Sequence, residues 1–158
     1  MIAPFAQHEE TVRPEWIDYN GHMNLAYYVV VFDHATDVLF DMLGVGNAYR
    51  DARNCSNFVL ETHTLYEREV AEGDRLRVVS HLVAADAKRL HFFHEMFRAD
   101  EDRRAAAQEL LSIHVDLASR RSAPFPDDRA TVIEAMLRAR AGMPLPEGVG
   151  RRIAMPVR

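Results

Sequence analysis

A short segment near the N-terminus gathers the residues best suited to chemistry. Between Trp16 and Asn24 the chain carries an acid (Asp18), an imidazole (His22) and two amides, just before an apolar stretch with helical period. A helix N-terminus offers backbone N–H groups without partners and about half a positive charge, so it can stabilise the oxyanion that develops on an attacked carbonyl. A carboxylate within reach could attack that carbonyl or activate water. These residue types at this spacing make Asp18 a candidate catalytic carboxylate.

A simpler interpretation of the same segment stays open. Asp18-Tyr19-Asn20-Gly21 is also a turn sequence, because Asx side chains bond to nearby backbone and glycine accepts positive φ. In that case Asp18 is an exposed turn residue without a chemical role.

Further candidates come from a predicted strand and from the first helical turn. Glu61 and His63 are two residues apart, so they project from one strand face and could contact a substrate or orient a water. The alternative is a solvated surface pair, since a buried acid would need a partner. Tyr27 either hydrogen-bonds a substrate or packs in the core.

The elements that must position these groups can be outlined from hydrophobic period. Apolar residues recur every three or four positions from Asn24 to Leu43, which predicts a buried helix capped by Asn24 and closed by Gly44. A short strand is predicted before the loop, and short polar breaks separate four later strands into an antiparallel meander. The predicted strands cover 8–13, 57–70, 75–84, 89–98 and 105–117, and a last helix covers 127–141.

This order of elements predicts an α+β class. One apolar helix has to bury its face against the antiparallel sheet of about five strands, and the sheet must curl around it. That geometry is the hotdog fold.

Length and composition narrow the class of protein. The chain has 158 residues, of which 48% are hydrophobic, and a formal net charge of −5 without a long basic run. This size fits one domain, 1–158, with a core at about 8–126 and a C-terminal helix and tail at 127–158. The charge argues against nucleic acid as the main partner.

The same composition favours a cytoplasmic protein without a membrane partner. Cys55 is the only cysteine, no apolar run is long enough to cross a membrane, and the N-terminus lacks the pattern of a secretory signal.

The sequence does not favour a cysteine nucleophile, a serine nucleophile or a metal site. Cys55 would need an activating base to act as a nucleophile, and no serine lies in a Gly-x-Ser-x-Gly context. His91 and His94 are three residues apart on a strand, hence on opposite faces, and cannot chelate one metal together. No other His, Cys and Asp spacing suits a metal, so we predict no metal and no cofactor.

Several motifs resemble the 4-hydroxybenzoyl-CoA thioesterase superfamily of hotdog enzymes, and within it the betainyl-CoA thioesterases of carnitine catabolism. The resemblance covers about residues 10 to 126. The motifs are Pro-Glu-Trp-Ile-Asp-Tyr-Asn-Gly-His-Met-Asn from Pro14, Phe-Asp-His-Ala-Thr-Asp from Phe32, Leu-Glu-Thr-His from Leu60, Lys-Arg-Leu-His from Lys88 and Ile-His-Val-Asp-Leu-Ala from Ile113. The resemblance implies hydrolysis of an acyl-CoA to the free acid and CoA.

The resemblance also assigns roles to residues. It places the catalytic carboxylate on Asp18, and it implies that His22 and Asn24 line the same pocket. CoA carries phosphates, for which Lys88 and Arg89 at a hairpin entrance are candidates, with a solvent-facing pair as the alternative. Whether Asp18 acts as nucleophile or as general base stays open.

The acyl group stays open as well: betainyl, another short chain, or an aromatic group. A betaine carries a quaternary ammonium, which the aromatic faces of Trp16, Tyr19, Tyr27 and Tyr28 could hold.

A lone hotdog sheet leaves an exposed edge, so we expect a homodimer, with a dimer of dimers as a further possibility. The competing hypothesis for function is a non-catalytic acyl-CoA or small-ligand binding module on the same fold.

Overall fold

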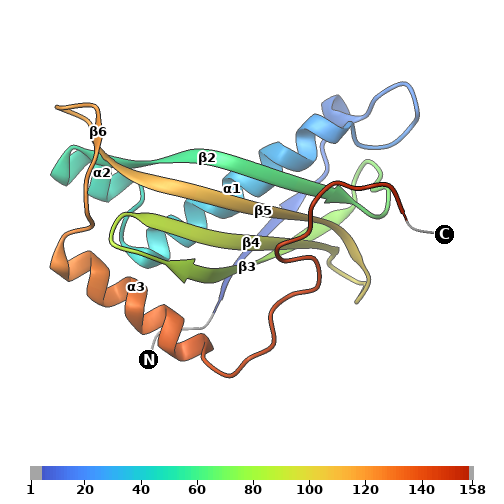
Figure 1. Cartoon of the computed structure of the whole chain (residues 1–158). Coiled ribbons are helices and arrows are strands. Elements are labelled where there is room, and N and C mark those ends of the chain that lie inside the picture. The colour runs from blue at the N-terminus through green and yellow to red at the C-terminus, as the bar shows by residue number, and fades with distance from the viewer. Residues whose placement is uncertain (1–4, 157–158) are drawn as a thin grey trace.

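Residues 5–156 are described by a computed structural model, in which one long helix packs against a curled antiparallel sheet (Figure 1). The helix is α1 (Leu25–Leu43). The strands are β1 (Ala6–Thr11), β2 (Cys55–Tyr66), β3 (Arg75–Ala85), β4 (Arg89–Arg98), β5 (Arg104–Asp116) and the short β6 (Arg121–Ser122). The other helices are a 3-10 turn (Pro14–Trp16), α2 (Asn47–Arg53) and α3 (Asp127–Arg140). The predicted α+β class, with a C-terminal helix, is confirmed.

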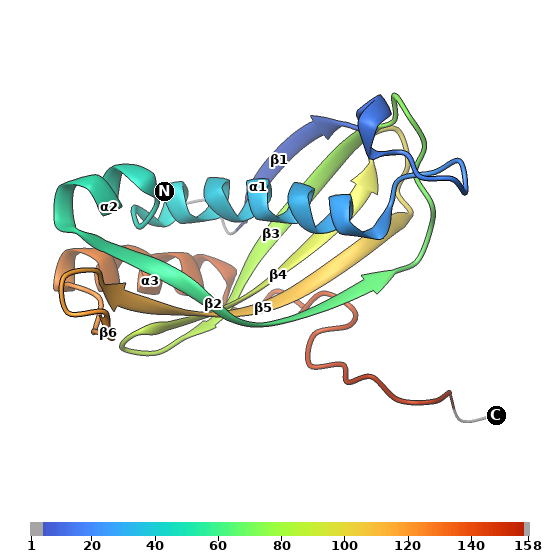
Figure 2. The ribbon, with the colours of Figure 1, turned by 90° about the horizontal axis from the view of Figure 1, so that it is seen from above.

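The sheet has the strand order β1-β3-β4-β5-β2, with β6 paired to β5. Only β3, β4 and β5 form a meander, so the predicted meander of four strands is wrong. β1 already pairs along the outer edge of β3, for instance Ala6 with Ser80, which leaves β2 the opposite edge beside β5, where Cys55 pairs with Asp116. The connection between β2 and β3 must therefore cross the end of the sheet, as Figure 2 shows.

Several predicted boundaries move, most of them by one or two residues. The first strand begins at Ala6 and ends at Thr11, two residues earlier than predicted at each end. β2 ends at Tyr66, not at residue 70, because the N–H groups of Glu67 and Arg68 both turn to the carbonyl of Ala105. The region after α1, predicted as loop, contains the seven-residue helix α2.

The ends of α1 form as the sequence predicts. The Asn24 side chain accepts a hydrogen bond from the N–H of Ala26, and Gly44 ends the helix in the left-handed conformation, with φ of 70°. The helix contains three consecutive β-branched residues, Val29, Val30 and Val31, which lower helix propensity. Burial keeps this stretch helical, because the face of α1 toward the sheet is almost fully shielded from solvent. This face consists of Tyr28, Val31, Phe32, Ala35, Thr36, Leu39, Phe40 and Leu43. Among the described residues, no helix combines the length and the apolar character that crossing a membrane would need.

The core between α1 and the sheet divides into two clusters. One lies under the C-terminal half of α1 and includes Leu39 together with Met136 from α3. The other lies under the N-terminal half and includes Phe32 together with Trp16 and Met23 from the loop before α1. Because the second cluster buries both ends of that loop, the loop is held in place by the core.

The chain after α3 crosses the outer face of the sheet, opposite α1 (Figure 1). The Arg104 guanidinium donates to the carbonyl of Glu147 at 2.7 Å, and the N–H of Gly150 donates to the Glu109 carboxylate at 2.9 Å. These two contacts attach the C-terminal segment to β5.

Candidate active site

The loop that carries Asp18 is a tight, internally bonded turn. The N–H of Asp18 donates to the carbonyl of His22 at 3.1 Å, and the N–H of Gly21 donates to the carbonyl of Asp18 at 3.0 Å. Gly21 has a φ of 84°, as the Asn-Gly pair predicts. One carboxylate oxygen of Asp18 accepts from the N–H of Asn20 at 2.8 Å, so Asp18 does help to form the turn.

The other carboxylate oxygen of Asp18 faces the start of α1. Its Oδ2 accepts from the Asn24 amide at 3.3 Å, and Asn24 is itself the N-cap of the helix. Asp18 is half-buried. The turn is therefore compatible with the chemical interpretation, since one oxygen forms the turn and the other lies beside the helix end.

A cavity of about 440 Å³ opens beside this carboxylate. The loop, the first turn of α1 and the end of β2 all contribute to its wall. The lining residues are Asp18, Asn20, His22, Met23, Leu25, Tyr28, Tyr66, Glu67, Arg68 and Glu69. Since Leu25 is the first residue of α1, the cavity has an acid and the positive end of a helix in the same wall.

His22 lies in this wall with one ring nitrogen free. Its Nε2 is 3.6 Å from the Glu69 carboxylate, whereas its buried Nδ1 has no hydrogen-bond partner in the part of the chain that the structure describes. A buried polar atom without a partner is costly, so this nitrogen is a polar group of the wall whose hydrogen bond is not made.

Two tyrosines form an aromatic corner of the cavity. The rings of Tyr28 and Tyr66 meet edge to face, with centroids 5.2 Å apart, and their hydroxyls donate to the carbonyls of Arg68 and Leu25. Burial raises the pKa of Tyr28, and the negative charge of Glu69 adds to this, while burial raises the pKa of Tyr66. Both phenols therefore stay neutral at physiological pH. Tyr66 has no counterpart among the site residues predicted from the sequence.

The other aromatic candidates lie elsewhere. Trp16 is buried and stacks on Tyr27 at 5.5 Å between centroids, with the Arg13 guanidinium 5.0 Å from its ring centre. Neither Trp16 nor Tyr27 lines the Asp18 cavity. Tyr19 is 97% exposed at the tip of the loop.

Glu61 and His63 line a separate cavity of about 450 Å³ on the outer face of the sheet. The C-terminal segment contributes Arg151 and Arg152 to its wall, and sequence reasoning did not predict this contact. Within one chain, the structure therefore does not bring Glu61 and His63 together with Asp18.

Lys88 and Arg89 lie at the end of the sheet opposite to Asp18. Lys88 Nζ donates to Ser122 Oγ at 3.1 Å, and Arg89 pairs with Asp86 in the same turn. The hydrogen bond from Arg89, together with that from the N–H of Lys88, lowers the pKa of Asp86 to about 2.

Other basic residues lie nearer to Asp18. Arg68 lines the Asp18 cavity and also borders a neighbouring groove of about 710 Å³, which contains Arg98 and Arg103. Sequence reasoning missed these arginines, because Arg68 reaches the cavity only through the crossing of residues 67–74 over the sheet end, beside the end of β4 and the turn after it, which carry the other two.

The histidines of β4 face opposite sides, as predicted. His91 bonds to Glu109 on the outer face, whereas His94 is fully buried between Thr36 and Ser80. They cannot share a metal.

Comparison with known proteins identifies the family. A model of the Thioesterase-like superfamily matches residues 12–139. The betainyl-CoA thioesterase of Pseudomonas aeruginosa is 42% identical over 156 residues, 99% of this chain and 98% of that protein. The L-carnitine dehydrogenase/betainyl-CoA thioesterase of Ruegeria pomeroyi is 34% identical over 99% of this chain, but the match spans only 31% of that protein. A Staphylococcus aureus structure in complex with CoA superposes with a TM-score of 0.89 and 31% identity, covering 99% of this chain and 98% of the other.

The fold is thus the hotdog fold of thioester hydrolases, as predicted. The chain belongs to the Thioesterase-like superfamily and is a thioesterase.

Proposed function

We propose that this thioesterase hydrolyses betainyl-CoA, or an acyl-CoA with a similarly compact cationic acyl group, to the free acid and CoA. The observation that carries the proposal is the shared cavity of Asp18 and Leu25, which sets a carboxylate beside the first residue of α1. The relative from Pseudomonas aeruginosa, named a betainyl-CoA thioesterase, supports the choice of acyl group.

In the proposed reaction, the thioester carbonyl lies against the start of α1 and Asp18 supplies the carboxylate. The N–H of Leu25 and the partial positive charge of the helix start stabilise the developing oxyanion, since the N–H groups of Ala26 and Tyr27 are already bonded to Asn24. Asp18 either attacks the carbonyl carbon, which gives a mixed anhydride that water then hydrolyses, or takes the proton of an attacking water. On both routes the C–S bond breaks, and the sulfur leaves with a proton as the thiol of CoA. Asn24 is a positioning residue, because it holds the Asp18 carboxylate and the helix end in one arrangement.

The cationic acyl group is proposed to lie at the Tyr28–Tyr66 corner. Aromatic faces attract a quaternary ammonium, which cannot donate hydrogen bonds. Among the charged groups of the same cavity, Glu67 is paired with Arg104 at 2.6 Å, and Glu69 and Arg68 carry opposite charges. The π faces are therefore the feature that suits a trimethylammonium group better than a neutral chain.

We further propose that the enzyme acts as a cytoplasmic homodimer paired along β2. This strand is at the free edge of the sheet and exposes three consecutive apolar residues, of which Leu60 is 55% exposed. The other two are Phe58 and Val59.

Antiparallel pairing of two β2 edges would complete the site. Tyr66, at one end of β2, lines the Asp18 cavity, whereas Phe58, near the other end, is in register with Ile113 and through it with Arg89. The Lys88–Arg89 end of a second copy would then lie near Asp18 of the first, as phosphate contacts for CoA. Glu61 and His63 would lie near the two-fold axis.

A free-thiol assay on a panel of acyl-CoAs tests the reaction. The panel contains betainyl-CoA, a neutral analogue of equal size, short aliphatic thioesters and aromatic thioesters. Betainyl-CoA is expected to give the highest kcat/KM. Ligand binding without release of thiol would contradict the proposed hydrolysis and indicate a binding module.

Asp18→Asn should lower turnover at least about a hundredfold. Asp116→Asn is the matched control, because Asp116 also accepts backbone N–H bonds in a turn, 3.0 Å from the N–H of Ala118, but at the far end of β5. If Glu61→Gln abolishes turnover while Asp18→Asn does not, the catalytic assignment is wrong.

Light scattering in solution tests the dimer. Leu60→Asp should halve the mass of the particle, while Leu145→Asp, which changes an equally exposed leucine of the C-terminal segment, should not. A mass unaffected by Leu60→Asp would contradict pairing along β2.

A further inference from the structure

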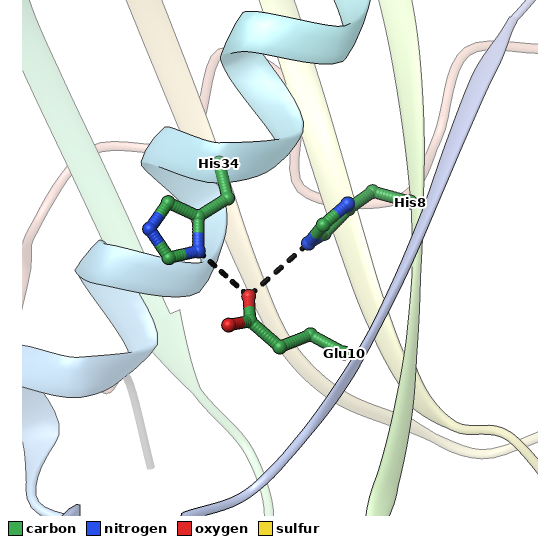
Figure 3. A group of neighbouring side chains, drawn as sticks. All are labelled: His8, Glu10 and His34. Atoms are coloured by element: carbon green, nitrogen blue, oxygen red, sulfur yellow. Dashed lines mark hydrogen bonds and ion pairs between the residues drawn. The ribbon is translucent and has the colours of Figure 1, made fainter.

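Two imidazoles and a carboxylate converge away from the proposed active site (Figure 3). The Oε2 atom of Glu10 lies 3.1 Å from His8 Nε2 and 2.7 Å from His34 Nδ1. The three possible ligand atoms all lie within 4.8 Å of one another. It is the only such group of three or more in the part of the chain that the structure describes.

The two elements that carry these residues are both well held. His8 and Glu10 are two residues apart on β1, so they project from the same strand face, toward α1. His34 projects from the middle of α1 to meet them, as Figure 3 shows. β1 is fixed by its ladder with β3, and α1 by its buried face, so the three side chains converge without any loop.

The donor set and its spacing suit a divalent transition metal. Zinc takes imidazole nitrogen and carboxylate oxygen at about 2.0–2.2 Å in a tetrahedral arrangement, which sets ligand atoms about 3.3 Å apart. The two separations from Glu10, 2.7 and 3.1 Å, reach this spacing with shifts of a few tenths of an ångström, and the two imidazole nitrogens lie within 4.8 Å of each other.

Charge and exposure also fit a bound cation. Asp33 precedes His34 and Asp37 follows it by one helical turn, so negative charge lies nearby, while Arg13 contacts the other Glu10 oxygen, Oε1, at 3.4 Å. The side chain of Glu10 is 12% exposed and that of His34 is 39% exposed. The group is thus sheltered on the protein side and open to water on the other.

We propose that His8, Glu10 and His34 form a zinc-class metal site, in which water occupies the fourth position. This replaces the expectation of no metal, which considered only residues close together in the sequence. The site lies in the middle of α1 rather than at its start, so it is independent of thioester hydrolysis. A bound metal would join the edge strand β1 to α1.

Metal-free protein titrated with Zn²⁺ tests the site, with bound metal measured by equilibrium dialysis. We expect the wild type to bind one Zn²⁺ per chain through His8, Glu10 and His34. The Tm should rise when the metal is added, because the metal binds the folded chain. His8→Gln and His34→Gln should each weaken Zn²⁺ binding at least about tenfold. Co²⁺ in place of Zn²⁺ should give the visible absorption of a tetrahedral site in the wild type and lose it in both variants.

His81→Gln is the matched control. His81 also lies 3.0 Å from a carboxylate, that of Glu95, but belongs to no group of three ligands among the described residues. Its Zn²⁺ affinity and Tm shift should equal those of the wild type. Zn²⁺ binding that is absent from the wild type, or that survives in a folded His8→Gln/His34→Gln double variant, would overturn the proposal.

Discussion

Asn24 contacts Asp18 and the first turn of α1 through one amide group. Its Nδ2 donates to Asp18 Oδ2 at 3.3 Å, and its Oδ1 accepts from the N–H of Ala26 at 3.0 Å. The orientation of the proposed catalytic acid and the start of the helix are thus linked by a single side chain.

This link allows the two roles of Asn24 to be separated. Asn24→Asp keeps a good N-cap but replaces the amide donor by a second carboxylate, so Tm should change little while turnover falls about tenfold or more. Asn24→Ala should lose both functions, with about 1 kcal/mol of stability lost as well. Thermal unfolding and the thiol assay measure the two effects. Full turnover in Asn24→Asp would show that the amide does not position Asp18.

The Tyr28–Tyr66 corner predicts a preference for a cationic acyl group. Tyr66→Leu removes a π face, which should reduce the preference for betainyl-CoA over a neutral analogue by about 0.5–2 kcal/mol in kcat/KM. Tyr66→Phe keeps the face and loses the hydroxyl that bonds Leu25, so it should retain the preference. Equal loss in both variants would point to the hydroxyl instead.

The buried His94 predicts that the protein loses stability in mild acid. Burial lowers the pKa of His94 to about 3, and the charge of His81 adds to this. The unfolded chain therefore binds a proton at this position that the folded chain does not bind. The contribution of neutral, buried His94 to the free energy of unfolding is fully present above about pH 6.5. It is lost as pH falls toward 3, by up to about 1.4 kcal/mol per pH unit.

Chemical denaturation between pH 6.5 and 5 measures this slope before most carboxylates titrate. His94→Gln can keep bonds to Thr36 and Ser80 but binds no proton, so its unfolding free energy should vary less with pH over that range. The same slope in the variant would assign the effect to other groups.

Substitutions at two glycines with positive φ allow the cost of backbone strain to be compared with the cost of an added steric contact. At Gly44, where φ is 70°, an added Cβ would lie 2.0 Å from an Arg129 guanidinium nitrogen, whereas at Gly73, with φ of 81°, it would meet nothing within 4 Å. Gly73→Ala should cost about 1–2 kcal/mol of stability from backbone conformation alone. Gly44→Ala should cost more, because Arg129 must also move and its bond to the carbonyl of Gly44 is disturbed. Denaturant unfolding of both variants compares the costs.

The sequence predicted best those features that depend on residues close together along the chain. Asn24 and Gly44 mark the ends of α1, and the Asn-Gly pair marks the turn that holds Asp18, because caps and turns depend on residues a few positions apart. The approach of Tyr66 and Glu69 to Asp18 could not be predicted in this way. It depends on β2 pairing with β5, and alternation along a strand does not specify its neighbour.

The proposed metal group was missed for the same reason. His34 is far from Glu10 along the chain, and a helical histidine gives no sign that an edge strand will lie beside it. Its contact follows only from the position of β1 in the sheet.

The strand order has a consequence for how the chain folds. The central hairpins, β3 with β4 and β4 with β5, join neighbours in sequence, whereas the outer ladders join Ala6 to Ser80 and Cys55 to Asp116. Closing such long loops is entropically costly. The three central strands should therefore form first, and the slower pairing of β1 with β3 and of β2 with β5 should follow. The wall of the Asp18 cavity, built from the chain on both sides of this closure, would then be among the last parts to become ordered.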